Sequence, residues 1–139
     1  MILVAVGLLA YADGRVLVQQ RSSEKMNLGG RWEFPGGKVE PGETMREALA
    51  REWMEELALP ITVGDLLDER VISFPECGPV LLPLFEVNFA DGHTWWPQEG
   101  QRVEVLDYDH VLSLPCVPSM GRYEAAVRDY LARLRSSHL

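Results

Sequence analysis

The sequence predicts an α+β fold in which a mixed β-sheet packs against helices. Candidate strands and helices are mixed along the chain without the regular β-α-β alternation that is typical of a parallel sheet. The chain of 139 residues is long enough to build its own core, and it shows neither a linker nor an internal repeat. Its composition of 47% hydrophobic and 24% charged residues excludes a disordered or low-complexity chain. We therefore expect residues 1–139 to form a single domain.

Two apolar runs near the N-terminus predict a β-hairpin. The runs Ile2 to Ala10 and Arg15 to Arg21 flank Asp13-Gly14, a pair that suits a tight turn. After a polar loop, the segment Pro35-Gly36-Gly37 is expected to end any strand and to let the backbone approach another group closely. Residues 38–43 are expected to stay in a loop.

The middle of the chain predicts a helix. Thr44, with Glu47 three residues later, has the spacing of a capping box, and the residues up to Leu57 are nearly all good helix formers. Pro60 ends the pattern. Strands are then expected at residues 71–74, 80–89 and 102–106, and a last helix is expected at residues 119–135.

Acidic residues outnumber basic ones in this chain. It has 21 Asp and Glu against 13 Lys and Arg, for a net charge of -8, which excludes general binding to a nucleic-acid polymer or an anionic membrane. Cys77 and Cys116 lack C-x-x-C or metal-ligand spacing, which speaks against zinc and against a disulfide framework. The apolar N-terminal run is too short for a bilayer and lacks a basic region. We expect a cytoplasmic protein, either a monomer or a homodimer.

Three glutamates share one face of the predicted helix. Glu52, Glu55 and Glu56 are spaced i, i+3 and i+4, which places them in one stripe of about 100°. A solvated acidic flank is the ordinary interpretation of such a stripe. Lys38, Glu43 and the glycine pair before the helix favour a different one, because bare backbone and hard carboxylate oxygens suit Mg²⁺ or Mn²⁺ carrying a polyphosphate. A second stripe is apolar and is expected to pack on the sheet; it consists of Leu49, Trp53 and Leu57.

The loop and helix together resemble the Nudix box, G-x5-E-x7-R-E-U-x-E-E-x-G-U, where U is a bulky aliphatic residue. The matching segments are Gly37 to Glu43 and Arg51 to Leu59, and the G, E, R, E, E and E positions are all filled at the required spacing. Trp53 replaces the first aliphatic residue, and we expect only local repacking around it. Ala58 replaces the glycine that ends the helix, and it would cost about 1 kcal/mol if it kept the left-handed turn.

Beyond the box, the chain resembles the MutT subgroup, the 8-oxo-dGTP diphosphatases, over roughly Val4 to Gln101. This resemblance implies an α/β/α sandwich around a mixed sheet. It also implies Mg²⁺-dependent hydrolysis of a nucleoside triphosphate to a monophosphate and pyrophosphate, with Mn²⁺ as a substitute metal. The implied metal ligands are the carbonyl of Gly36 and the carboxylates of Glu52, Glu55, Glu56 and Glu99.

The resemblance assigns the other roles to charged residues near this site. Glu99 would be a metal ligand or the general base. Arg51 would pair with Glu43 and so fix the loop against the helix. Arg21 would touch phosphate, and Lys38 would assist departure of the leaving group.

The region before the last helix leaves the substrate open. MutT proteins read the oxidised purine with an asparagine there, whereas residues 115–120 of this chain contain none and offer Ser119, whose alternative role is to cap the last helix. Phe34 and Phe74 are candidates for a base pocket or for the core, and so are Trp95 and Trp96, of which one would cover the site while the other packs. A cytidine nucleotide or another nucleoside-diphosphate-linked compound stays an alternative substrate. A domain that only binds nucleotide stays an alternative function.

Overall fold

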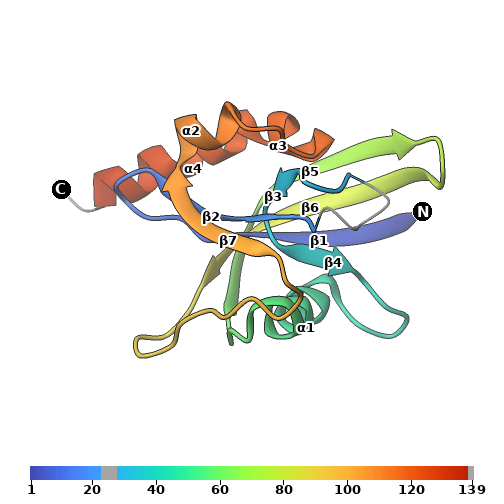
Figure 1. Ribbon diagram of the computed structural model, residues 1–139, viewed down its shortest axis with the longest axis horizontal. Coiled ribbons are helices and arrows are strands. Elements are labelled where there is room, and N and C mark those ends of the chain that lie inside the picture. The colour runs from blue at the N-terminus through green and yellow to red at the C-terminus, as the bar shows by residue number, and fades with distance from the viewer. Residues whose placement is uncertain (23–27, 138–139) are drawn as a thin grey trace.

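The strands form two sheets that lie between two layers of helices. The computed structural model of the protein describes residues 1–22 and 28–137. Helix α1 (Met45–Leu57) covers one side of the strands, whereas α2 (Tyr108–Leu112), α3 (Pro118–Arg122) and α4 (Glu124–Ser137) lie on the other side (Figure 1). This arrangement is the predicted α/β/α sandwich.

The larger sheet is mixed, as the sequence predicted. Its strands, in the order β4-β1-β6-β5, are β4 (Gly36–Lys38), β1 (Ile2–Leu8), β6 (Gly78–Asn88) and β5 (Thr62–Phe74). β1 runs parallel to β6, and the other neighbours are antiparallel. The parallel pair joins the beginning of the chain to a strand far along the sequence.

The smaller sheet is antiparallel and shows that the predicted hairpin is wrong for most of its length. Its order is β3 (Trp32–Glu33), β2 (Arg15–Gln20) and β7 (Arg102–Asp107). β1 and β2 meet only near their turn, where the amide of Leu17 donates to the carbonyl of Leu9 at 2.9 Å, and they then enter different sheets. Both strands carry runs of buried residues, which is typical of central strands covered on both faces.

Other boundaries also differ from the prediction. Residues 36–38 form β4 instead of a loop, because their backbone pairs with β1. β5 begins at Thr62, well before the predicted residue 71. Its first half was missed because β5 is a largely exposed edge strand with register shifts, and these obscure the alternation of apolar and polar residues. The last helix is divided at Tyr123 into α3 and α4, and the short helix α2 was not predicted.

Helix α1 confirms the predicted helix and its capping box. The Thr44 side chain accepts from the amide of Glu47, and the Glu47 side chain accepts from the amide of Thr44. Ala58 ends the helix with φ 52° and ψ 32°, and its amide donates to the carbonyl of Met54. Ala58 therefore keeps the left-handed turn for which glycine is the usual residue.

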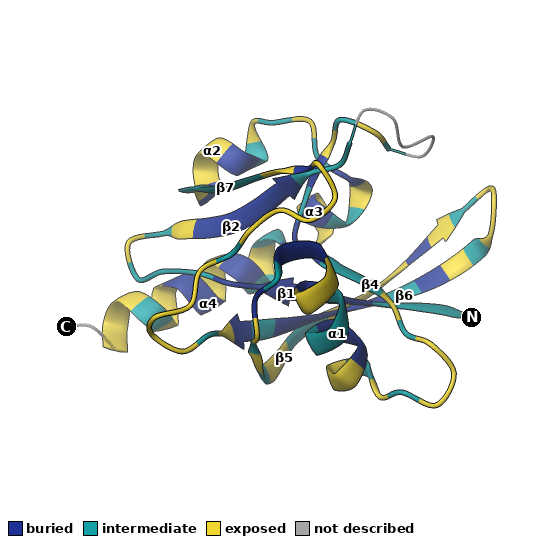
Figure 2. Ribbon diagram, turned by 60° about the horizontal axis from the view of Figure 1, so that its bottom comes forward, coloured by how far each residue is buried: buried dark blue, intermediate teal, exposed yellow. Residues whose placement is uncertain are grey.

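The core is divided into two clusters, one on each side of the strands. The α1 side is centred on Leu49, Trp53 and Leu57, all completely buried, which confirms the predicted apolar stripe; Figure 2 shows the buried and exposed faces of α1. Trp53 fits because Gly7 has no side chain: a Cβ there would lie 2.8 Å from the indole nitrogen, which donates to the carbonyl of Pro35. Among the described residues, no helix combines the length and the apolar character needed to cross a membrane.

Candidate active site

A cavity of about 630 Å³ is lined by residues of β1, β4, α1, the loop before β7 and the start of α3. One part of its lining is charged and another is apolar. The charged lining residues are Arg21, Glu33, Lys38, Glu52, Glu56, Glu76 and Glu99. The apolar lining residues are Ile2, Val4, Val6, Leu28, Phe34, Phe74, Val80, Leu82, Val117 and Pro118. Such a combination suits a ligand that carries both charged and apolar groups.

The three helical glutamates lie in three different environments. The Glu55 side chain is 56% exposed and lies outside the cavity lining. The Glu52 side chain is 18% exposed and lines the cavity, and its burial raises its pKa although Arg51 donates to it. Glu56 is buried and also lines the cavity. The common stripe predicted from the sequence therefore contributes two carboxylates to the cavity wall.

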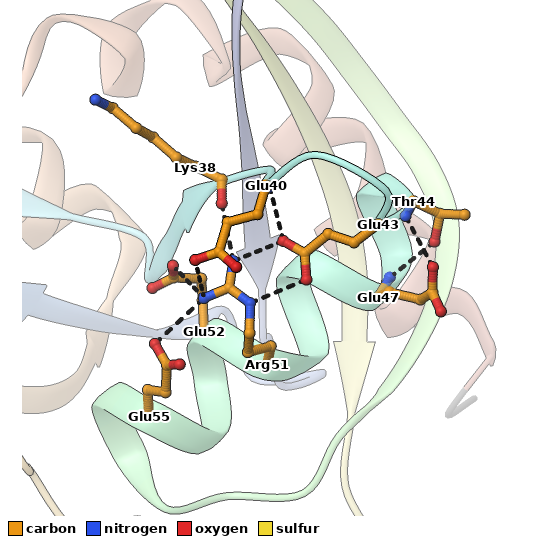
Figure 3. Close-up of polar contacts among 8 residues, drawn as sticks. All are labelled: Lys38, Glu40, Glu43, Thr44, Glu47, Arg51, Glu52 and Glu55. Atoms are coloured by element: carbon orange, nitrogen blue, oxygen red, sulfur yellow. Dashed lines mark hydrogen bonds and ion pairs between the residues drawn. The ribbon is translucent and has the colours of Figure 1, made fainter.

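Arg51 holds the loop before α1 against the helix, as the resemblance implied (Figure 3). Its Nη2 and Nε donate to the two carboxylate oxygens of Glu43 at 2.7 and 3.0 Å, and Nη2 also donates to the carbonyl of Lys38 at 3.0 Å. Its Nη1 donates to Glu52 at 2.8 Å and to Glu55 at 3.3 Å. Hydrogen bonds from Arg51, and one from the amide of Glu40, lower the pKa of Glu43 to about 2.

Gly37 lets β4 lie directly against α1. A Cβ at this position would overlap the carboxylate of Glu52. The glycine pair that the sequence analysis associated with close approach therefore has a specific neighbour, and that neighbour is one of the proposed metal ligands.

Glu56 has no cationic partner among the described residues. The amide of Gln19 donates to its Oε1 at 3.3 Å, whereas its Oε2 is buried and has no hydrogen-bond partner among the described residues. Burial raises the pKa of Glu56 to about 8, and the neighbouring carboxylates of Glu33, Glu52 and Glu99 act in the same direction. Both effects favour the protonated form of this carboxyl group.

Sequence reasoning missed two buried glutamines and one glutamate beside this group. Gln19 and Gln101 are 3% and 9% exposed, and both line the cavity. Gln19 donates to Glu33 at 3.1 Å, and Glu33 also accepts from Arg21 at 3.0 Å. A polar residue at the end of the apolar run of β2, and a carboxylate between Trp32 and Phe34, were the available signals.

The loop that carries Glu99 is attached to the C-terminal end of α1. The amides of Trp96 and Gln98 donate to the carbonyls of Leu57 and Glu56 at 2.8 and 2.9 Å. Free carbonyls at a helix C-terminus need such donors, and the loop supplies them. Glu99 is thereby brought to the same cavity as Glu52 and Glu56.

The oxygen donors at the cavity are of the type that binds a hard divalent cation, although they do not form a complete coordination site. In residues 1–22 and 28–137, no group of three or more His, Cys, Asp or Glu side chains forms a finished metal site. Glu52, Glu56, Glu99 and Gly36 nonetheless line one cavity, the three carboxylates offer only oxygen, and among the described residues Oε2 of Glu56 is buried without a partner. Oxygen-only donors suit Mg²⁺ or Mn²⁺. The full ligand set stays a prediction, since Glu55 contacts Arg51 outside the cavity.

The predicted phosphate contacts lie at the same cavity. Lys38 lines it, and its side chain points away from the Arg51 cluster in Figure 3. Arg21 also lines it and pairs with Glu33. Both cations thus line the same cavity as Glu52, and their roles stay predictions.

The aromatic predictions divide into two outcomes. Phe34 and Phe74 both line the cavity, and Phe34 also belongs to the core at 3% exposure. The expectation that Trp95 or Trp96 covers the site is wrong. Trp95 packs edge-on against Phe89 in the α1-side core, and Trp96 is 65% exposed.

Ser119 lines the cavity and does not cap the last helix. Helix α3 begins at Pro118, its N-cap is Val117, and no side chain makes a capping hydrogen bond there. Proline is well suited to the first helical position, so the helix begins before Ser119. The expected capping role is therefore wrong, and a substrate contact by Ser119 stays a prediction.

Comparison with known proteins agrees with this geometry. The NUDIX domain family matches residues 1–125. The 8-oxo-dGTP diphosphatase of Proteus vulgaris is 41% identical over 73 residues, which cover 52% of this chain and 64% of that protein, slightly less than two thirds. The CTP pyrophosphohydrolase of Escherichia coli (strain K12) is 44% identical over 116 residues, which cover 82% of each chain. The solution structure of the E. coli ORF135 protein matches with a TM-score of 0.75 and 30% identity, covering 95% of this chain and 89% of that one.

The chain therefore belongs to the Nudix family. Within that family, its similarity to 8-oxo-dGTP diphosphatases makes it a MutT-like Nudix hydrolase, as the resemblance over Val4 to Gln101 implied.

Proposed function

We propose that this chain, acting as a single domain, hydrolyses a nucleoside triphosphate such as 8-oxo-dGTP to the monophosphate and pyrophosphate with the help of Mg²⁺, and so clears it from the cytoplasmic nucleotide pool. The observation that carries the proposal is the buried carboxylate of Glu56, one oxygen of which has no partner among the described residues, in a cavity that it shares with Glu52 and apolar side chains. The diphosphatase activity named for the Proteus vulgaris relative supports this choice.

The charge of the cavity supports a divalent cation. Among the described lining residues, five glutamates face two cationic side chains. A triphosphate would be repelled by this surplus, whereas divalent cations between the two sets of oxygens would attract both. A cation would also stabilise ionised Glu56, the form that burial disfavours.

The proposed roles follow from the placement of each group. Glu52, Glu55, Glu56, Glu99 and the carbonyl of Gly36 would hold Mg²⁺, which supplies a water of lowered pKa and neutralises phosphate charge. The Glu99 carboxylate would accept the proton of the attacking water if it serves as the general base.

Other residues would bind and orient the substrate. Arg21 and Lys38 would contact the phosphate chain, and Lys38 would offset charge on the leaving group. Phe34 and Phe74 would contact the base, and Ser119 would offer it a hydrogen bond. Arg51 and Glu43 would act indirectly, by fixing β4 against α1.

A cytidine nucleotide is the second candidate substrate. The absence of asparagine from residues 115–120, with Ser119 at the cavity, leaves out the group with which MutT proteins read an oxidised purine. The relative named as a CTP pyrophosphohydrolase is 44% identical and aligns over 82% of this chain. A small hydroxyl is compatible with either base.

A substrate panel tests the proposal. Canonical and oxidised nucleoside triphosphates, dinucleoside polyphosphates and sugar nucleotides would be incubated with the purified chain and Mg²⁺, and kcat/KM would be measured for each. We expect a nucleoside triphosphate to be preferred, with monophosphate and pyrophosphate as products and no activity in EDTA. Negligible rates with every compound, combined with measurable nucleotide binding, would instead identify a binding domain.

Two variants test the site within the same assay. Glu99→Gln is expected to lower kcat by about 100-fold or more with a small change in KM, as for loss of a general base. Glu69→Gln is the matched control, because Glu69 is exposed on β5 and lies outside the cavity lining. Equal turnover of both variants would exclude a base or essential ligand role for Glu99.

A further inference from the structure

Two buried glutamine side chains connect the Glu99 loop to Glu56. The side-chain nitrogen of Gln101 donates to the backbone carbonyl of Glu56 at 2.9 Å and to Oε1 of Gln19 at 3.3 Å. Oε1 of Gln101 accepts from the backbone amide of Glu99 at 2.9 Å. The nitrogen of Gln19 donates to Oε1 of Glu56 at 3.3 Å and to Oε2 of Glu33 at 3.1 Å. Both amide groups therefore use two donor hydrogens and one acceptor oxygen.

The orientation of each amide is determined by its neighbours. The backbone amide of Glu99 can only donate and the carbonyl of Glu56 can only accept, so a rotated Gln101 would face both groups with the wrong atom. Gln101 in turn presents a hydrogen to Gln19, which must answer with its oxygen. Both hydrogens of Gln19 are then directed at carboxylates, and Glu56 receives a donor on Oε1 while Oε2 has none among residues 1–22 and 28–137.

The hydrogen bonds of these side chains explain why buried positions are occupied by amides. Gln19 and Gln101 are 3% and 9% exposed, and burial of two primary amides is unfavourable unless their hydrogen bonds are satisfied. An apolar pair would fill the same space without that requirement. What an apolar pair would lack is the ability to attach the Glu99 backbone and orient the Glu56 carboxylate at the same time.

We propose that Gln101, acting through Gln19, is a positioning residue that sets Glu99 and Glu56 relative to each other for hydrolysis. The inference rests on the function proposed above, because it assigns both carboxylates to the reaction. Loss of Gln101 would remove the hydrogen bonds that hold the Glu99 loop and the side chain of Gln19. The positions of the Glu99 and Glu56 carboxylates would then no longer be fixed relative to each other. Groups that orient metal ligands typically change activity or metal affinity by about 10- to 100-fold.

Kinetics of matched variants test the catalytic part of this proposal. We expect Gln101→Leu to lower kcat by about 10- to 100-fold while KM changes by less than about threefold. Gln101→Glu has nearly the same shape and keeps the acceptor for the Glu99 amide but loses both donors, so kcat should stay low. A role in packing alone would be restored by this variant. Gln19→Leu and Gln101→Leu break the same chain of hydrogen bonds. The double variant should therefore lose no more kcat than the worse single variant.

The control is Gln20→Leu, on the neighbouring residue of β2. Its side chain donates to the carbonyl of Gly30 and lies outside the cavity lining, so kcat should remain within about twofold of the wild-type value. All assays would be made at a temperature where circular dichroism shows the variants to be folded. Wild-type kcat in folded Gln101→Glu would overturn the proposal, as would equal losses in Gln20→Leu and Gln101→Leu.

Hydrogen exchange measured by NMR tests the contacts without any substrate. The backbone amide of Glu99 should exchange slowly in the wild type and in Gln101→Glu, and rapidly in Gln101→Leu. An unchanged exchange rate of the Glu99 amide in Gln101→Leu would overturn the proposed hydrogen-bonded connection between Gln101 and the Glu99 loop. If the wild type showed this protection but hydrolysed no nucleotide, the proposed function would fail while the hydrogen-bonded connection stood.

Discussion

Replacement of Glu56 by glutamine should stabilise the metal-free protein, and the gain should grow with pH. Burial, and then the negative charges of Glu33, Glu52 and Glu99, raise the pKa of Glu56 from 4.5 to about 8. Because this pKa is raised, the stabilising contribution of the protonated group is fully present below about pH 4.5. It is lost progressively as the pH rises to about 8.

The size of this effect follows from linkage. A tenfold change in proton affinity corresponds to about 1.4 kcal/mol, so ionised Glu56 lowers the free energy of unfolding by up to about 5 kcal/mol above pH 8. At pH 6 the same reasoning gives about 2 kcal/mol. Glutamine keeps an oxygen for the hydrogen bond from Gln19 and carries no charge. Glu56→Gln should therefore gain about 3 kcal/mol over the wild type between pH 6 and pH 8.5.

Urea unfolding in EDTA at these two pH values would measure the difference, with m-values checked for equality. Glu55→Gln is the control, because the Glu55 side chain is more than half exposed and should show no such pH-dependent gain. A difference between Glu56→Gln and the wild type that does not change with pH would refute the reasoning. Added Mg²⁺ should stabilise the wild type more than Glu56→Gln, since a bound cation favours the ionised group.

Three further changes test local features of the fold. Ala58→Gly should raise the free energy of unfolding by about 0.5–1 kcal/mol in urea, because glycine adopts the left-handed turn without strain. Gly37→Ala should lower kcat by about 100-fold, because the new Cβ would displace the carboxylate of Glu52. Glu43→Gln should be less stable than the wild type at pH 6, and thermal unfolding should show this deficit shrinking from pH 5 to pH 3. The reason is that Arg51 lowers the pKa of Glu43 to about 2, so the stability from that carboxylate is lost as it becomes protonated.

Two controls separate these effects from general sensitivity to substitution. Ala50→Gly, inside α1, should destabilise by about 1 kcal/mol, opposite in sign to Ala58→Gly. Gly121→Ala should leave kcat unchanged, since no described heavy atom outside its chain neighbours and its own helix backbone lies within 4 Å of the added Cβ. Destabilisation by Ala58→Gly, full turnover of Gly37→Ala, or a Glu43→Gln deficit that is constant with pH would each contradict the corresponding argument.

Features that depend on near neighbours were predictable from the sequence. The capping box of α1, its apolar stripe and its end at Ala58 all appear where they were expected, because helical geometry is determined by residues within a turn or two. The pair of Arg51 with Glu43 was also available, through the spacing of the Nudix box. In these cases residue type and interval carry most of the information.

Features that depend on distant neighbours were not predictable from the sequence. β1 and β2 look like a hairpin along the chain, but each is a central strand of a different sheet, and partners such as β6 and β7 lie far along the sequence. Ser119 looked like a helix cap because the start of α3 at Pro118 was not expected. Strand pairing was decided by which apolar faces could be buried together, whereas the start of α3 follows from Pro118 at its first position.

The sequence by itself determined that three glutamates share one helix and lie beside a glycine-bearing loop, since a spacing of i, i+3 and i+4 needs only helical geometry. Only the tertiary structure decided that they differ. Glu55 faces solvent and Arg51, Glu52 lies against Gly37, and Glu56 is buried beside Gln19 and Gln101. Burial and the charge of groups brought from other strands and loops set the proton affinity of a carboxylate, and neither is encoded by position on a helix.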